Sequence, residues 1–409
     1  MASNCICPLP WNHAYVEMNG DVKLCCVAQP ALKERNLIDT PVSEFVDSRY
    51  MAHIRKQMLM GMWPVECGGC KKAELLGLES HRTGIINRDP QSYQQLTKDP
   101  SEDKVKLSSL DLRISNECNF KCRSCSVSFS NAWRDDFQAI YPNNISVEDL
   151  TKNRAIQGIE GNTSFWDQLD ERQLGDIKEW HFAGGEALLS DKHYQLLEKL
   201  ISIKAFDSKI TYTTNFSIIQ YKHWNILEML KPFHNVVFHL SLDGAGEKGE
   251  YIRKGLNWKR WLKNLRLLRK SLPKAKLDIH FVVSILNILD LQWHIQQIED
   301  VNEFRDPATK QLNVGFTCLD RPSHLSIQVL SPELKKKAKQ RLVAISEHQA
   351  TAKNIREAMV GIINFLDQKD LHQQQFREFL RTTTILDQRR KEDYRRLFPE
   401  LAEMELTKV

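Results

Sequence analysis

The chain has 409 residues, 42% of them apolar, which is enough for a substantial core and for more than one folded unit. Its 57 basic and 52 acidic residues leave a net charge of only +5, a balance too weak to indicate a nucleic-acid-binding protein. No stretch approaches the ~18 apolar residues of a membrane span, and the first residues lack the features of a secretory signal, so we expect a cytoplasmic protein.

Cysteine is the residue type that most restricts the possible functions. Nine of the 10 cysteines fall in the first third of the chain. In a reducing compartment, such clustering with Cys-x-x-Cys spacing favours metal or redox chemistry over structural disulfides.

The first expected element is a β-hairpin. Two strand-like segments, residues 14–18 and 21–25, flank Asn19 and Gly20. This dipeptide readily adopts the two positive φ angles of a type I′ turn. The hairpin would place Cys25 near the cysteines that begin the chain.

A helical pattern over residues 43–60 follows the hairpin and leads to Cys67-Gly-Gly-Cys70 in a glycine-rich turn. The polar, unpatterned stretch that comes next is typical of a linker, which we place at residues 76–105. We therefore expect an N-terminal Cys-rich domain over residues 1–75.

From residue 106 to residue 330, short strand-like segments alternate with helical ones. The expected strands are residues 107–114, 177–183, 209–214, 236–242, 277–284 and 314–318. Strand and helix in alternation indicate parallel βα units, and about six of them predict a partial (β/α)6 TIM-like barrel in an α/β protein. A mostly helical insertion at residues 127–175 could cover the open side of this barrel.

Residues 331–409 predict a helical C-terminal region packed on the barrel. Apolar residues form two faces there, one with Met359, Ile362, Ile363 and Leu366 and one with Phe376, Phe379 and Leu380. We interpret the basic runs at residues 335–339 and 389–396 as solvated helix faces.

The most informative motif is Cys118-x3-Cys122-x2-Cys125, directly after the first expected barrel strand. In βα barrels the reactive groups lie at the carboxyl ends of the strands. Three thiolates can hold an iron–sulfur cube while leaving one iron open to a small molecule. A zinc site with a fourth ligand from elsewhere is the alternative that this motif leaves open.

A second motif, Gly184-Gly185-Glu186, ends the second expected strand. The two glycines would let backbone carbonyls approach a ligand closely, and Glu186 can accept hydrogen bonds from an ammonium group. With the three cysteines at the preceding strand end, the chain resembles the radical S-adenosylmethionine (SAM) superfamily. The resemblance implies that Cys118, Cys122 and Cys125 bind a [4Fe-4S] cluster whose fourth iron chelates the methionine moiety of SAM.

Later strand ends continue the resemblance. In such proteins these positions contact the methionine carboxylate, the ribose and the adenine. The residues that match in this chain are Asn215, Ser241, Asp243 and Arg253. Each is also an ordinary turn or surface residue, so only their shared location favours ligand contacts. Ser124 departs from the aromatic residue that many family members carry before the third cysteine, which puts the adenine contact there in doubt.

The N-terminal cysteines resemble a SPASM or twitch auxiliary-cluster domain, although such domains generally follow the barrel. The resemblance implies a second [4Fe-4S] cluster bound by Cys7, Cys25, Cys67 and Cys70. Three alternatives remain open: a structural zinc ion, a redox pair formed by Cys67 and Cys70, or replacement of one ligand by Cys5 or Cys26.

The resemblance implies an enzyme that takes an electron from a flavodoxin or ferredoxin, cleaves SAM and abstracts hydrogen from a peptide or protein side chain. A small-molecule substrate, such as a sugar or nucleotide, is the alternative within the same chemistry. A zinc-stabilised binding protein on a barrel scaffold is the alternative from another class. Cys318, at the end of the last expected strand, could donate a hydrogen atom or a proton, but we interpret it as a buried strand cysteine.

Overall fold

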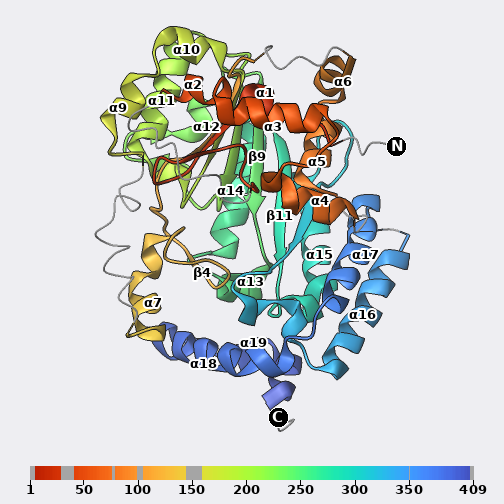
Figure 1. Cartoon of the computed structure of the whole chain (residues 1–409). Coiled ribbons are helices and arrows are strands. Elements are labelled where there is room, and N and C mark those ends of the chain that lie inside the picture. The colour runs from red at the N-terminus through yellow and green to blue at the C-terminus, as the bar shows by residue number, and fades with distance from the viewer. Residues whose placement is uncertain are drawn as a thin grey trace. The chain divides into compact units, whose positions relative to one another are not determined.

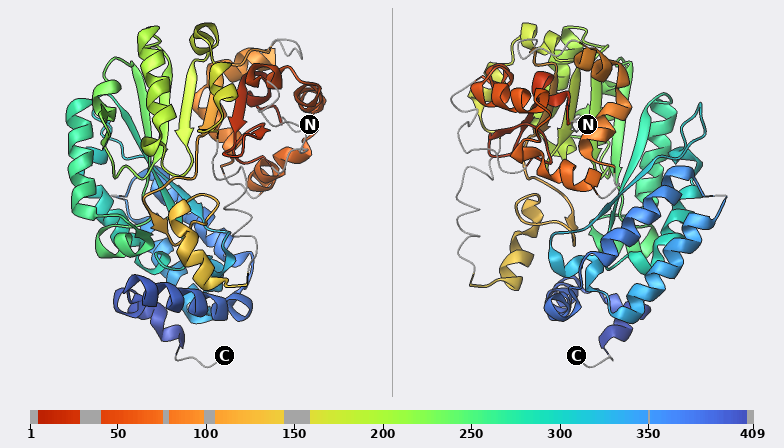
Figure 2. Two further views of the ribbon diagram at one scale, coloured as in Figure 1. Left: turned by 90° about the vertical axis from the view of Figure 1, so that its left-hand side faces the viewer. Right: turned by 45° about the vertical axis from the view of Figure 1, so that its right-hand side comes forward.

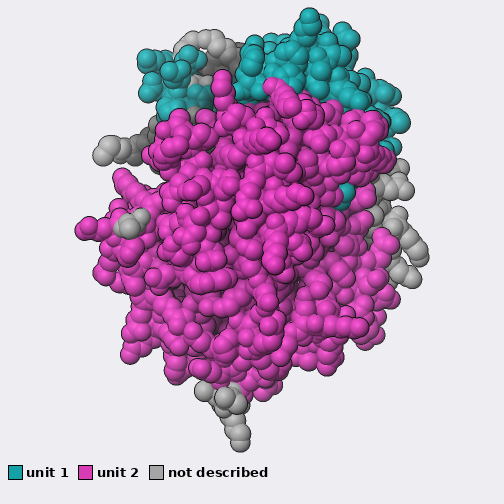
Figure 3. Space-filling model, turned by 180° about the vertical axis from the view of Figure 1, so that it is seen from behind, with its two compact units in different colours: residues 1–116, 153–211, 232–235 teal, residues 117–152, 212–231, 236–409 magenta. Residues whose placement is uncertain are grey.

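The computed structural model describes residues 5–28, 41–75, 79–98, 105–143, 159–349 and 351–405. The chain divides into two compact units. Unit 1 comprises residues 1–116, 153–211 and 232–235, and unit 2 comprises residues 117–152, 212–231 and 236–409 (Figure 3, teal and magenta). Figure 1 labels helices of both units and the strands β4, β9 and β11.

Unit 1 contains four strands that lie side by side. Their order is β2 (Val22–Lys23), β1 (His13–Val16), β3 (Ser109–Arg113) and β5 (Glu179–Ala183). β1 pairs with β2 in antiparallel orientation, whereas β1 with β3 and β3 with β5 are parallel pairs. The N-terminal hairpin therefore continues the sheet formed by the first two expected barrel strands.

The turn of this hairpin differs from the expected type I′ turn. Gly20 adopts a φ of 86°, but Asn19 is not among the described residues with positive φ. The Gly20 amide donates to the Glu17 carbonyl at 2.9 Å, and the Asn19 side chain accepts from the Asp21 amide at 3.0 Å. This is the pattern of a three-residue loop, in which a type I turn is followed by one left-handed glycine.

The helices of unit 1 begin with three that flank the hairpin in sequence: α1 (Leu9–Asn12), α2 (Val42–Val46) and α3 (Arg49–Leu59). The single helix expected over residues 43–60 is thus divided in two, because Ser48 caps α3 by accepting a hydrogen bond from the Met51 amide at 3.3 Å. The remaining helices are α4 (Gly68–Leu75), α5 (His81–Arg88), α6 (Pro90–Lys98), α9 (Thr163–Asp167), α10 (Glu171–Asp176) and α11 (Asp191–Ser202). Hence α5 and α6 occupy much of the segment expected to be a linker.

Unit 2 contains the parallel strands β9 (Asn235–Ser241), β11 (Lys276–Val283) and β12 (Val314–Cys318), in that order. β6 (Lys209–Thr214) spans the boundary between the two sets of residues. Two short antiparallel pairs are β4 (Lys121–Cys122) with β10 (Arg253–Lys254), and β7 (Gln220–Tyr221) with β8 (Trp224–Asn225). All six strands expected for the barrel are therefore present, and the alternating parallel βα architecture of a partial barrel is confirmed.

The helices of unit 2 follow the strands and fill the C-terminal region. They are α7 (Arg134–Ile140), α12 (Ile226–Met229), α13 (Gly246–Ile252), α14 (Trp258–Ser271), α15 (Leu291–Glu299), α16 (Pro332–Glu347), α17 (Lys353–Asp367), α18 (His372–Arg390), α19 (Tyr394–Leu397) and α20 (Pro399–Ala402). α16 and α17 run side by side (Figure 2). None of the helices in the described ranges is long and apolar enough to cross a membrane.

The apolar faces expected in the C-terminal region are buried, including Met359 and Ile362 on α17 and Phe376 and Phe379 on α18. The interpretation of residues 389–396 as a solvated face is wrong for Arg390. Its side chain is buried, and its Nε donates to Asp136 at 3.0 Å.

Buried histidines make the stability of the fold sensitive to acid. Burial of His193 on α11 lowers its pKa from 6.5 to about 3. Below pH 6.5 the unfolded chain therefore binds a proton that the folded chain does not, and stability falls with pH until about pH 3. Each pH unit in this window costs about 1.4 kcal/mol for one such histidine.

We expect His193→Phe, which keeps an aromatic ring beside Phe182, to reduce the loss of stability between pH 7.5 and pH 5.5 by about 1 kcal/mol. Urea unfolding at the two pH values measures this loss, and His53→Gln at an exposed position controls for removal of a histidine. Equal pH dependence in wild type and His193→Phe would contradict the prediction.

Candidate functional site

The loop that carries Cys118, Cys122 and Cys125, here called the cysteine loop, packs against the segment around Arg253. Cys122 lies in β4, where it pairs directly with Arg253 of β10. Gly255, which follows β10, has a φ of 115°. A Cβ atom there would lie 2.6 Å from the Phe120 ring and 2.9 Å from the Asn119 carbonyl, so only glycine fits. The segment around Arg253 thus packs directly on the cysteine loop.

The three thiols of this loop share one electrostatic environment. Burial raises the pKa of Cys122 to about 12, against the influence of the Arg253 guanidinium, and the Cys125 and Cys118 thiols raise the pKa further. The Phe120 amide lies 3.4 Å from Cys118 Sγ and donates to it, and Asn215 Nδ2 lies 3.9 Å from the same sulfur. Clustered thiols with N–H donors directed at sulfur fit a cluster held by three cysteines, because such hydrogen bonds stabilise its charge.

Arg253 and Asp243 form a buried ion pair beside these thiols. Arg253 Nη1 lies 2.8 Å from Asp243 Oδ2, and Asp243 is fixed in turn by the Val282 amide at 3.1 Å and by Asn287 Nδ2, which donates to its carbonyl at 2.9 Å. The Nε atom of Arg253 is buried without a hydrogen-bond partner in the described structure. An anionic ligand would satisfy this donor.

The remaining predicted SAM contacts are divided between the units. Asn215, Asp243 and Arg253 lie together with the cysteines in unit 2, and Ser241 ends β9 two residues before Asp243. The Gly184 motif belongs to unit 1.

Local packing already requires glycine at position 184. Gly184 adopts a φ of 126°, and a Cβ there would lie 2.7 Å from the Ser115 carbonyl. The Gly185 amide donates to that same carbonyl at 2.8 Å. Glu186 is buried, and its Oε1 accepts from the Leu188 amide at 3.2 Å, which caps a short 3₁₀ helix. The role of Glu186 in binding an ammonium group stays a prediction.

The four cysteines predicted for the auxiliary cluster converge in unit 1. Burial raises the pKa of Cys7 to about 12, and the Cys25 and Cys70 thiols raise it further. Burial likewise raises the pKa of Cys67 to about 12, and Cys7 and Cys70 add to it. Cys67 ends a 3₁₀ helix and Cys70 lies in α4, so the pair is helical rather than part of a turn. The set fits a cluster with four thiolate ligands.

The other two N-terminal cysteines occupy different surroundings. Cys5 is buried, and its thiol donates to the Met62 carbonyl at 3.3 Å. Cys26 is exposed, with its sulfur 3.8 Å from His81 Nε2. Neither observation assigns these cysteines as ligands.

In the described ranges, no group of three or more His, Cys, Asp or Glu side chains is arranged to hold a single metal ion. A [4Fe-4S] cube takes each thiolate on a different iron, so its ligands stand farther apart than ligands that share one ion.

Arg82 of α5 is a charged residue near the N-terminal cysteines that the sequence did not reveal. Its Nη1 donates to the Ile6 carbonyl at 3.0 Å, and its Nε and Nη2 contact both oxygens of Glu74 at 2.9 and 2.6 Å. Glu74 lies in α4, the helix of Cys70. The Arg82–Glu74 ion pair therefore links the segment of Ile6 to the helix of Cys70. Arg82 and Glu74 are too far from Ile6 in sequence to form a recognisable motif with it.

A row of polar residues across three strands was also missed. Tyr15, Asp111 and His181 lie directly opposite one another on β1, β3 and β5. His181 Nδ1 lies 3.0 Å from Asp111 Oδ2, and Arg113 contacts Asp111 at 3.2 Å and the Tyr15 hydroxyl at 3.3 Å. Burial alone would raise the pKa of Asp111, but the charges of His181 and Arg113 hold it at about 2.

This row lies on the inner face of the strands. Phe182, next to His181, contacts His193 of α11 with ring centroids 4.9 Å apart, so the helix covers the opposite face. In a βα barrel the helices lie outside, so the polar row faces the interior. Asp111 Oδ1 is buried without a hydrogen-bond partner in the described part of the chain. The polar row could have been recognised from the alternation of apolar and charged residues in Leu110, Asp111, Leu112 and Arg113, because parallel strands are usually continuously apolar.

The solved structures that this chain matches are distant. Native anSMEcpe with bound AdoMet is 17% identical, with 59% of this chain and 60% of that chain covered and a TM-score of 0.36. Streptococcus suis SuiB bound to S-adenosylmethionine is 15% identical, with coverage of 75% and 61% and a TM-score of 0.31. The chain thus spans about 60% of the length of these structures. A search of curated proteins finds no match.

Family models give a more specific result. Residues 112–298 match the Radical SAM superfamily, and residues 5–71 match SPASM, an iron–sulfur cluster-binding domain. The two domains bring a SAM-binding [4Fe-4S] cluster, SAM and an auxiliary iron–sulfur cluster. The chain therefore belongs to the radical SAM superfamily and carries a SPASM domain ahead of its radical SAM domain.

Proposed function

We propose that this protein is an enzyme that reductively cleaves SAM and abstracts hydrogen from a peptide or protein side chain. When bound to three cysteines, the cluster supplies the electron that converts SAM to methionine and a 5′-deoxyadenosyl radical. The observation that carries the proposal is the clustering of the Cys118, Cys122 and Cys125 thiols beside the buried Arg253–Asp243 pair.

The residues of unit 2 then have separate tasks. Cys118, Cys122 and Cys125 hold the cluster, and Asn215 orients the Cys118 sulfur. The unsatisfied Nε of Arg253 binds an anionic or hydroxyl-bearing part of SAM, and Asp243 fixes the guanidinium for this purpose. Ser241 contributes a hydroxyl at the end of β9, the strand that leads to Asp243.

In unit 1, Gly184, Gly185 and Glu186 receive the ammonium group of SAM, as the resemblance implies. Cys7, Cys25, Cys67 and Cys70 hold the auxiliary cluster, whose binding region extends over about residues 1–75. The barrel then occupies residues 106–330, and the helical C-terminal region occupies residues 331–409.

Substrate is proposed to meet the polar row on the inner face of unit 1. Hydrogen abstraction followed by loss of one electron from the substrate radical leaves a proton to be removed, and His181, held by Asp111, is placed to accept it. Cys7, Cys25, Cys67 and Cys70 would hold the auxiliary cluster that could take up this electron. A peptide substrate is proposed over a sugar or nucleotide because many radical SAM proteins with an auxiliary cluster act on peptides, and the resemblance implies a flavodoxin or ferredoxin as the source of the initial electron.

We expect anaerobically reconstituted, reduced protein to convert SAM to 5′-deoxyadenosine. Cys122→Ala should reduce this formation at least about 100-fold, because the cluster loses one of its three ligands. Cys318→Ala, at the end of β12, is the control and should retain activity. Liquid chromatography with mass spectrometry measures the product, and a fully iron-loaded wild-type protein that forms none would refute the proposed function.

Iron content tests the second cluster. Wild-type protein should bind about eight iron atoms per chain, and a Cys7→Ala/Cys25→Ala double variant about four, because only the auxiliary site loses its ligands. Iron, sulfide and zinc are measured together on the same samples. About four irons and one zinc in the wild type would instead identify the N-terminal site as a structural zinc site.

A further inference from the structure

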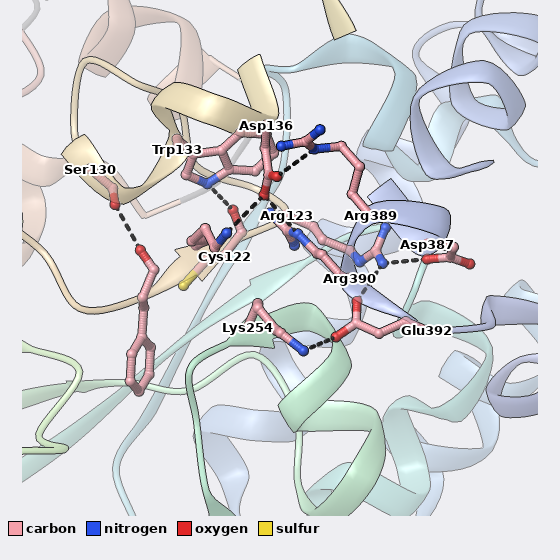
Figure 4. Close-up of polar contacts among 12 residues, drawn as sticks. Cys122, Arg123, Ser130, Trp133, Asp136, Lys254, Asp387, Arg389, Arg390 and Glu392 are labelled. Carbon is pink, nitrogen blue, oxygen red and sulfur yellow. Dashed lines mark hydrogen bonds and ion pairs between the residues drawn. The ribbon is translucent and has the colours of Figure 1, made fainter. Parts of the chain in front are cut away.

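Arg123, the residue directly after Cys122, is anchored by the C-terminal region. Its side chain is only 2% exposed. The guanidinium forms ion pairs with Asp387 and, at 2.8 Å, with Glu392. It also lies 3.7 Å from the centre of the Tyr251 ring. Figure 4 shows Asp387 and Glu392 beside the Arg123 guanidinium.

Both carboxylates are themselves fixed. Asp387, near the end of α18, accepts from the Tyr251 hydroxyl at 2.9 Å and from the Tyr394 amide at 2.8 Å. Glu392 follows α18 and lies 2.9 Å from Lys254, which pairs with Lys121 in the β10–β4 ladder. The acidic residues therefore contact β10 through Lys254 and, through Arg123, the residue that directly follows β4.

The same end of α18 also holds the other side of the loop. Trp133 Nε1 donates to the Cys122 carbonyl at 2.9 Å. The Arg390 guanidinium lies 5.0 Å from the centre of the Trp133 ring and bonds to Asp136, which also lies 3.4 Å from Lys121 Nζ. Leu386 packs with Trp133 in a buried apolar cluster. One helix end thus restrains the Cys122 backbone from two directions.

We propose that residues 386–392 are a positioning element of the SAM-cluster site. Asp387 and Glu392 hold Arg123, and Arg123 sets the orientation of the turn between Cys122 and Cys125. Neither matched family segment extends beyond residue 298, so this element lies outside both. The inference rests on the proposed function, because it concerns the cluster of the same three cysteines.

The contacts of Arg123 make the SAM-cluster site depend on the C-terminal helices, although these helices lie outside both matched family segments. A turn that binds two irons tolerates little rotation, since each sulfur must point at its own iron. A buried guanidinium with two carboxylate partners is fixed in position by their charge and by the fork geometry of its N–H groups. The Arg123 amide adds a backbone bond to the Ile252 carbonyl at 2.8 Å.

Asp387→Asn tests the inference on full-length, reconstituted protein. Electron paramagnetic resonance of the reduced protein, recorded with and without SAM, should show changed g-values and a smaller SAM-induced shift. The reduction potential should become more positive, because a negative charge near the cluster is removed. Far-UV circular dichroism and iron content should match the wild type.

Two milder variants keep the test informative if Asp387→Asn does not fold. Arg123→Lys keeps the charge but loses the Nε bond to the Tyr251 carbonyl and the planar group over the Tyr251 ring, and Tyr251→Phe removes only the hydroxyl that bonds Asp387. Both should change the spectrum in the same direction. Glu400→Gln is the control, because Glu400 pairs with Lys337 and Arg341 of α16 and has no ion pair with the cysteine loop among the described residues.

Spectra and potentials equal to those of the wild type in all three variants would overturn the inference while leaving the proposed function intact. A fully loaded wild-type protein whose spectrum does not respond to SAM would overturn the proposed function and this inference together. A change confined to melting temperature, equal to that of Glu400→Gln, would identify the contacts as structural only.

Discussion

Parallel pairing of β1 with β3 is the interaction on which unit 1 depends. It joins the hairpin next to the N-terminal cysteines to the strand that precedes the cysteine loop. SPASM domains generally follow the radical SAM barrel, and here the order is reversed. A strand can join the open edge of a parallel sheet from either end of the chain, because edge N–H and C=O groups accept any suitably spaced partner. The pairing is therefore compatible with the unusual domain order.

The sequence predicted the barrel strands well, because buried parallel strands are short apolar runs bounded by polar residues and glycine. It failed where one local contact decides the outcome. The Asn19-Gly20 turn has one positive φ angle rather than two, because the strands pair with three residues between them. Ser48 divides the expected helix by capping, and the polar composition of the expected linker hid two helices whose surfaces are mostly solvated.

Candidate site residues could be recognised from the sequence where they belong to short motifs or stand at the ends of expected strands. Cysteine spacing and the Gly184 motif were visible, as was the segment around Arg253. Contacts such as Arg123 with Asp387 join residues 264 positions apart, and no pattern in either segment indicates the other. Asp111 and His181 are likewise meaningful only after strand register is known. Pairing at long sequence separation depends on the whole fold, which is why the charged partners of both cysteine sets were missed.

The polar row also helps to set the register of the N-terminal hairpin on the sheet. Tyr15 stands opposite Asp111, and its neighbours Ala14 and Val16 are apolar. A slip of β1 by one residue would turn Tyr15 away from Arg113 and bring an apolar side chain against a buried carboxylate. The charged row thus adds to the burial of Ala14 and Val16 in fixing the register. A single register of β1 also gives Cys25, which follows β2 by two residues, a single position along the sheet.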